Sequence, residues 1–206
     1  MAQSPAHGTD HHDHHHAAGH HDPQDIKLLG FWIFLVTDVI LFATLFATFI
    51  VLRGGTDGFE TGAELFNMTG VIAETFLLLT SSFTSGLAVL AMHQNKVKPM
   101  ITWLVVTGLL GAGFLALELI EFVELVHEGA TLQTSAYWSS FFTLVGTHGV
   151  HVTIGIGWMI SIIIQILRRG LNSDTKGKVT VFSLYWHFLD AVWIFLLSIV
   201  YLMEVM

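Results

Sequence analysis

The chain has 206 residues, of which 53% are hydrophobic and only 12% are charged, and its formal net charge is −8. So few charges cannot cover the apolar core of a soluble protein of this size, which excludes an ordinary soluble enzyme and a disordered chain. The excess of Asp and Glu over Lys and Arg argues against a nucleic-acid partner, and the absence of cysteine excludes disulfides, iron–sulfur clusters, thiolate metal sites and cysteine nucleophiles.

Residues 1–25 differ in composition from the rest of the chain. They include four Asp, almost no large apolar residues and eight of the thirteen histidines, namely His7, His11, His12, His14, His15, His16, His20 and His21. We expect this tail to be disordered, because it cannot bury enough apolar surface to offset the entropy of ordering. It lacks the apolar centre of a signal peptide, and its imidazoles would bind divalent ions in vitro.

Five long apolar stretches follow the tail. Each exceeds the roughly 20 residues that a helix needs to cross the hydrocarbon core of a bilayer. Only helices satisfy every backbone hydrogen bond in lipid over such runs, since the strands of a β-barrel would be shorter and would alternate. The sequence therefore predicts an all-α membrane domain over residues 26–206, with transmembrane helices at 28–52, 71–92, 100–126, 137–167 and 179–203.

The basic residues predict how the helices are oriented in the membrane. Five crossings place the N-terminus, the second loop and the fourth loop on one side. That side would carry Lys27, Lys96, Lys98, Arg168, Arg169, Lys176 and Lys178. The opposite side would carry Arg53 alone. By the positive-inside rule the N-terminus is cytoplasmic and the C-terminus lies outside.

Ionisable side chains inside these helices are the candidates for function, because each needs a partner or a water-filled cavity. A rise of about 1.5 Å per residue places Asp38, His148 and Asp190 in one layer near the bilayer midplane. By the same measure His151 and His187 lie just on the cytoplasmic side of that layer. Asp38 is the only charge in residues 28–52, so we expect it either to be protonated or to bond to a donor at the same depth, with His148 the nearest by depth and His151 or His187 next. We expect Asp190 to pair with His187, with backbone amides or with a partner subunit.

A second group of carboxylates, Glu74, Glu118 and Glu121, is placed by depth close to the outer interface. Several of these groups are three residues apart on one helix and therefore share a face: His148 with His151, His187 with Asp190, and Glu118 with Glu121. Such pairs suit a proton relay or a ligand site. They also suit hydrogen bonds that simply hold helices together, which need no chemistry.

Two rival functions remain open at this point. A haem-bearing membrane anchor would use His148 or His151 together with His187 as axial ligands. A stand-alone proton-coupled transporter would use Asp38, His148 and Asp190. The Glu-x-x-His pattern of di-iron proteins occurs once, at Glu124 and His127, where two copies are needed, so we expect no di-iron site.

Two segments resemble the paired signature of subunit III of haem–copper terminal oxidases. They are residues 146–152 (GTHGVHV) and residues 185–193 (YWHFLDAVW). Residues 118–121 (ELIE) are similar to the family's Glu-x-x-Glu, and Asp38 lies where the family often carries Glu. Five helices rather than seven, together with the histidine-rich tail, resemble the bacterial bo-type ubiquinol oxidase branch.

The resemblance implies a non-catalytic subunit of a proton-pumping enzyme that oxidises quinol and reduces oxygen to water in the inner membrane of a bacterium. It implies that haem and copper lie in the catalytic subunit I, and that this chain has no catalytic, cofactor-binding or metal-binding residue. The implied partners are subunit I directly, and subunits II and IV in the same complex. Family members hold phospholipid in a cleft between the first two shared helices and the other three. They support the stability and proton uptake of subunit I.

Overall fold

The computed structural model describes residues 23–56 and 68–202. This part of the chain contains no strand and forms five long helices: α1 (Pro23–Leu52), α3 (Met68–His93), α4 (Val97–His127), α5 (Ala136–Arg169) and α6 (Ser173–Leu196). All five are long and apolar enough to cross a membrane. The all-helical class and the five membrane-length helices are therefore confirmed, whereas the direction in which they cross stays a prediction.

The helices begin earlier than the apolar runs from which they are predicted. α1 begins at Pro23 rather than at residue 28, and α6 begins at Ser173 rather than at residue 179. The predicted bounds mark the hydrocarbon-soluble stretch, and a helix continues through polar residues until it meets a cap. The predicted disorder of the tail concerns mainly residues 1–22, which lie outside the described residues, while residues 23–25 belong to α1.

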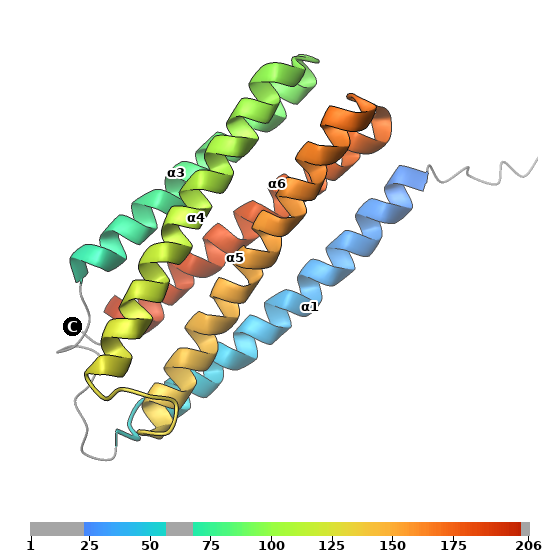
Figure 1. Cartoon of the computed structure of the whole chain (residues 1–206). Helices are drawn as coiled ribbons and strands as arrows, with labels where there is room; N and C mark the ends of the chain where they lie inside the picture. The colour runs from blue at the N-terminus through green and yellow to red at the C-terminus, as the bar shows by residue number, and fades with distance from the viewer. Residues whose placement is uncertain (1–22, 57–67, 203–206) are drawn as a thin grey trace, which may run out of the picture.

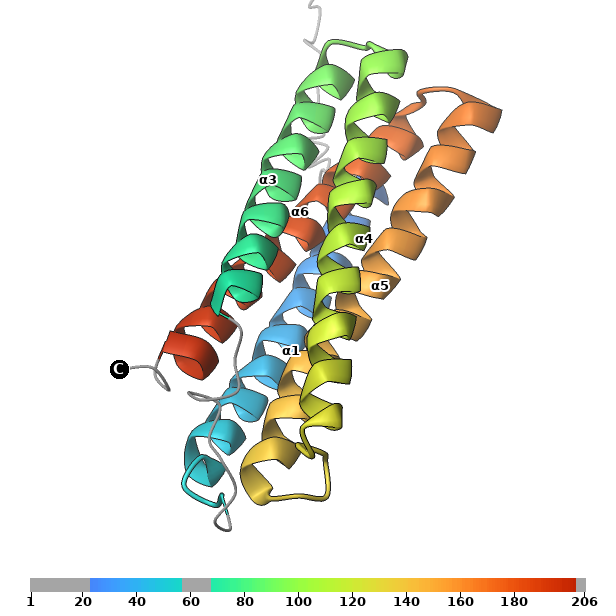
Figure 2. The ribbon, with the colours of Figure 1, turned by 60° about the vertical axis from the view of Figure 1, so that its left-hand side comes forward.

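α6 lies at the centre of the helix contacts. It packs against α1, α3 and α5, while α3 also packs against α4, and α5 packs against both α1 and α4. Figure 1 shows the bundle with the α3–α4 pair on one flank and α1 on the other, and Figure 2 shows it from a second side. The first two helices both pack on the other three, since α1 contacts α5 and α6 while α3 contacts α4 and α6, and the lipid cleft that the resemblance implies between the two groups stays a prediction.

Trp186 of α6 fills the space between three neighbouring helices. Its ring is buried, and its Nε1 donates a hydrogen bond of 3.0 Å to Ser81 Oγ on α3. The ring packs directly on the backbone of Gly111 in α4 and Gly155 in α5, where an added Cβ would lie 2.8 Å and 3.0 Å from ring atoms. Glycine at these two positions is what lets the helices close around the indole.

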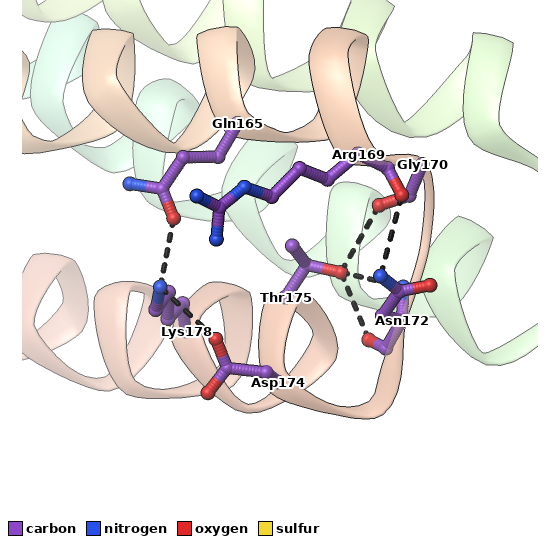
Figure 3. Close-up of polar contacts among 7 residues, drawn as sticks. All are labelled: Gln165, Arg169, Gly170, Asn172, Asp174, Thr175 and Lys178. Carbon is purple, nitrogen blue, oxygen red and sulfur yellow. Dashed lines mark hydrogen bonds and ion pairs between the residues drawn. The ribbon is translucent and has the colours of Figure 1, made fainter.

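The turns at 94–96 and 170–172 lie at the same end of the bundle, which we call the basic end because Lys96, Lys98, Arg168, Arg169, Lys176 and Lys178 surround them. At the second turn Gly170 has φ +69°, a conformation that favours glycine, and it caps α5. Figure 3 shows the start of α6, where Thr175 Oγ1 accepts from the Asn172 backbone N–H at 2.7 Å. The same view shows Lys178 Nζ donating to Gln165 Oε1 at 2.8 Å.

The last described turns of the chain are wider than an α-helix. Residues Leu197–Leu202 form a π-helix that continues α6, in which each backbone bond spans five residues instead of four. Val200 and Tyr201 are buried in this segment. The predicted end of the helix at residue 203 lies just outside the described residues.

Candidate functional site

Asp38 of α1 faces α5 in the middle of the bundle. Its Oδ1 lies 3.7 Å from Nε2 of His151, and its side chain is buried in a helix that is otherwise largely exposed. Tyr185 of α6 closes the same layer, since its hydroxyl donates to the backbone carbonyl of His151 at 3.1 Å. Three helices therefore meet around one carboxylate and one imidazole.

The hydrogen bonding of His151 decides where the protons of this pair can be. Its Nδ1 lies 2.7 Å from the backbone oxygen of Thr147. A carbonyl only accepts, so Nδ1 carries a hydrogen, and the remaining site, Nε2, faces Asp38. The 3.7 Å between Nε2 and Asp38 Oδ1 is longer than a hydrogen bond, so the pair is an electrostatic contact between α1 and α5.

His148 does not pair with Asp38, so the expectation that it is the nearest partner is wrong. The imidazole is fully buried among the rings of Phe42, Phe114 and Trp193, with centroid distances of 6.4, 5.8 and 5.5 Å. Neither ring nitrogen has a hydrogen-bond partner among the described residues. A charged imidazole in this cage would lack any compensating group, so the residue acts as part of the aromatic packing.

His187 and Asp190 of α6 both interact with Ser82 of α3. His187 Nδ1 lies 2.6 Å from Ser82 Oγ. Asp190 lies within electrostatic range of His187 and also contacts Ser82, while its Oδ1 has no partner among the described residues. The predicted pairing of Asp190 with His187 is therefore shared with Ser82, which sequence reasoning missed. The signal for it was the run of hydroxyls at Ser81, Ser82, Thr84 and Ser85 on the buried face of α3.

The structure brings Glu74, Glu118 and Glu121 together at the end of the bundle opposite the basic end. Glu74 lies within electrostatic range of the other two, and their side chains are only 1%, 4% and 9% exposed. No Lys, Arg or His forms an ion pair with them among the residues that the structure describes. Like charges this close in a low-dielectric layer cannot all be ionised, so the cluster holds protons.

Gly149 of α5 and Tyr201 of the π-helix lie next to this carboxylate cluster. Both oxygens of Glu118 lie against the bare backbone of Gly149 in α5, where a Cβ would be 2.8 Å and 3.1 Å from them. The buried Tyr201 of the π-helix lies within electrostatic range of all three carboxylates. Glycine in the signature helix and the widened end of α6 thus make room for the acidic groups.

The three membrane histidines of the described chain face different surroundings: an aromatic cage, a carboxylate and a serine. No group of three His, Asp or Glu side chains within residues 23–56 and 68–202 is placed to hold a metal ion. The pairing of His148 or His151 with His187 that a haem anchor needs finds no support in these contacts.

A pocket of about 860 Å³ opens at the basic end between α1, α3 and α6. Apolar side chains line most of it, among them Leu28, Phe31, Met92 and Trp158. Lys176 and Lys178 also line it, together with Asp174, whose carboxylate lies 3.1 Å from Lys178 Nζ. A lining that is mostly apolar but includes two Lys side chains suits an amphipathic ligand with an anionic head.

Comparison with known proteins decides the family. The family model described as cytochrome c oxidase subunit III matches residues 6–205. The chain belongs to the cytochrome c oxidase subunit III family. The chain is 56% identical over 178 residues to the protein named quinol oxidase subunit 3 of Bacillus spizizenii, covering 86% of this chain and 87% of that protein.

Other members of the subunit III family carry different names for the complex. The chain is 51% identical over 177 residues to cytochrome c oxidase subunit 3 of Bacillus sp. (strain PS3), covering 86% of each chain. It is 47% identical over 186 residues to cytochrome bo(3) ubiquinol oxidase subunit 3 of Pseudomonas putida, covering 90% of each. The similarity spans most of the length of these relatives, and the family-model match over residues 6–205 includes every residue of the site described above.

Proposed function

We propose that this chain is a non-catalytic subunit III of a proton-pumping ubiquinol oxidase, an enzyme complex that oxidises quinol and reduces oxygen to water. The observation that carries the proposal is the near full-length match to proteins named quinol oxidase subunit 3. Within the described residues His148 packs among aromatic rings, His151 faces Asp38 and His187 contacts Ser82, so all three take part in packing the bundle.

In this proposal the haems and the copper belong to the partner subunit I, and subunits II and IV complete the complex in the inner membrane of a bacterium. The basic end faces the cytoplasm, because cytoplasmic loops of membrane proteins carry an excess of Lys and Arg. The pocket at the basic end holds a phospholipid, whose acyl chains contact Phe31 and Trp158 while its phosphate meets Lys176 or Lys178.

The Asp38–His151 pair supports sustained proton uptake by the neighbouring subunit rather than redox chemistry. Asp38 lies in a layer where an unpaired carboxylate would cost roughly 2.5–3.5 kcal/mol even on the lenient insertion scale. The imidazole of His151, 3.7 Å from its Oδ1, offsets part of that cost. The carboxylate cluster of Glu74, Glu118 and Glu121 links α3 to α4.

Purification of the tagged chain from native membranes tests this function. Co-purification of a haem-bearing subunit with quinol oxidase activity is expected. A chain that runs alone in mild detergent, yet transports protons after reconstitution, would instead support the stand-alone transporter. Soret absorption of the isolated chain would support the haem anchor.

A further inference from the structure

An imidazole is exposed in the middle of α6, the helix that packs against three others. His187 lies 14 residues after Ser173 and 15 residues before Leu202, the two ends of this membrane-length helix. At about 1.5 Å per residue it is about 12 Å beyond Val179, where the apolar stretch begins, and therefore inside the hydrocarbon layer. Its side chain is nevertheless on the surface of the chain. A polar ring facing acyl chains at this depth is costly and calls for a covering group.

The two nitrogens of His187 have different surroundings. Nδ1 is engaged with Ser82 Oγ on α3 at 2.6 Å, which fixes the plane of the ring. Nε2 has no hydrogen-bond partner in the part of the chain that the structure describes. Since Ser82 holds the opposite edge of the ring, Nε2 points away from the bundle. Nε2 of His187 is thus available for a hydrogen bond with a group from outside the described part of this chain.

The exposed face of α6 around His187 has a regular spacing. Its outward residues alternate by four and three positions along the α-helix, and they form what we call the α6 seam: Thr180, Leu184, His187, Ala191 and Ile194. All are exposed or half-buried. A repeat of 3.5 residues is the spacing at which two helices stay in register along their length. Ala191 and Thr180 are small enough to let a second backbone approach closely.

The α6 seam runs along the space between α1 and α3. Both of these helices pack on α6, one on each side of the seam (Figures 1 and 2). At the basic end the seam begins at Thr180, which lines the pocket together with Phe31 of α1 and Met92 of α3. Beyond the pocket, α6 has α1 and α3 as neighbours, so the seam suits a single helix better than the α6 of a second copy, which has its own α1 and α3 beside it.

We propose that the α6 seam is the docking surface for one transmembrane helix of a different subunit of the complex, which presents a hydrogen-bonding side chain to His187 Nε2. The inference rests on the proposed function, which supplies the neighbouring subunits, and adds which face they meet. An acyl chain offers no hydrogen-bonding group at the depth of His187 and has no register to match the seam. A transmembrane helix with a polar side chain supplies both a hydrogen-bonding group at the depth of His187 and a residue spacing that matches the seam.

Photo-crosslinking in native membranes tests the proposal. A benzoylphenylalanine at Ala191, one turn from His187 on the seam, is expected to form an adduct with a second polypeptide, mapped to a transmembrane helix with a polar residue. The matched control is the same probe at Ile154, which is 58% exposed near the middle of α5. One helix cannot cover both faces, so equal adducts with the same helix from both positions would overturn the proposal.

Three other outcomes are informative. Adducts of the Ala191 probe with lipid alone, or with a second copy of this chain, would overturn the docking surface while co-purifying subunits would leave the proposed function intact. Failure of the unmodified chain to co-purify with any subunit would overturn the proposed function and this inference with it. The crosslinking uses native His187, so it does not depend on whether a His187 variant folds.

Substitution of His187 measures the same contact. His187→Leu removes the hydrogen bond and is expected to speed dissociation of this chain from the complex roughly 3- to 18-fold, the range for interhelical hydrogen bonds in membranes. His187→Asn keeps a donor and an acceptor and is expected to restore most of the association. The control is Thr153→Val, whose exposed hydroxyl already bonds its own helix at Gly149. An unchanged dissociation rate for His187→Leu would contradict the proposal.

Discussion

Replacing Gly111 by alanine should disturb the packing of Trp186 directly. The new Cβ would lie 2.8 Å from two carbons of the indole, Cζ2 and Cη2, well inside ordinary contact. The ring cannot move away easily, because its other edge packs on the backbone of Gly155 in α5, where an added Cβ would lie 3.0 Å from Cζ3. Its Nε1 is also hydrogen-bonded to Ser81. Overpacking of this kind costs about 1–3 kcal/mol. For a chain of this length that corresponds to roughly 2–12 °C in the unfolding midpoint.

The matched control is Gly157→Ala, since nothing lies within 4 Å of the Cβ it would add. Both substitutions replace glycine inside the same kind of helix, so the gain in helix propensity, about 1 kcal/mol, is common to them. The difference between the two variants then reports the contact with Trp186 alone.

The assay is the temperature at which this chain leaves the purified complex, followed on native gels. Gly111→Ala should lower that temperature relative to Gly157→Ala. Combining Gly111→Ala with Trp186→Phe removes the clashing ring atoms, and the two changes should be non-additive by more than about 0.5 kcal/mol. Equal dissociation temperatures for the two glycine variants would show that the indole is not held tightly, and the packing argument would fail.

Three further predictions concern the polar groups. Asp38→Asn should leave assembly and the haem spectrum of the partner intact but make quinol oxidation decline faster over many turnovers; an altered haem spectrum would place Asp38 at a redox centre and contradict the proposed function. Glu118→Gln replaces a buried carboxyl that lacks a counter-charge, so the heat stability of the complex should not fall; a drop of several degrees would reveal a cation that the described contacts lack. Asn172→Ala removes the cap of α6 and should cost about 1 kcal/mol, measurable as earlier dissociation on heating, while quinol oxidation at low temperature stays normal.

The sequence predicts the helices well because lipid leaves few alternatives to them. The long apolar runs locate all five helices. The ends of the helices differ from the predicted bounds where polar residues such as Asn172 extend or cap a helix beyond the hydrocarbon. Depth along a helix also groups Glu74 with Glu118 and Glu121, since all three are close to one end of the bundle.

Partners within a layer could not be predicted from depth alone. His148 and His151 differ by about 60° around α5, because three residues turn an α-helix by about 300°. That angle sends one ring into an aromatic cage and the other toward Asp38. Which side of α5 faces α1 depends on the packing of the whole bundle. The link from His187 to Ser82 required the same knowledge, because the two residues are 105 positions apart.

The π-helical end of α6 sets the rotational phase of Val200 and Tyr201 within it. A π-turn accommodates one more residue than an α-turn, so Leu197–Leu202 behaves as a single-residue insertion that the bundle has absorbed without a loop. Deleting one residue at its start would shift the side chains up to Leu202 by about 100° around the helix axis. Tyr201 would then leave the carboxylates and turn toward the surface. Length variation of one residue, harmless in a connecting loop, would act at this point like a substitution of the buried Val200 and Tyr201.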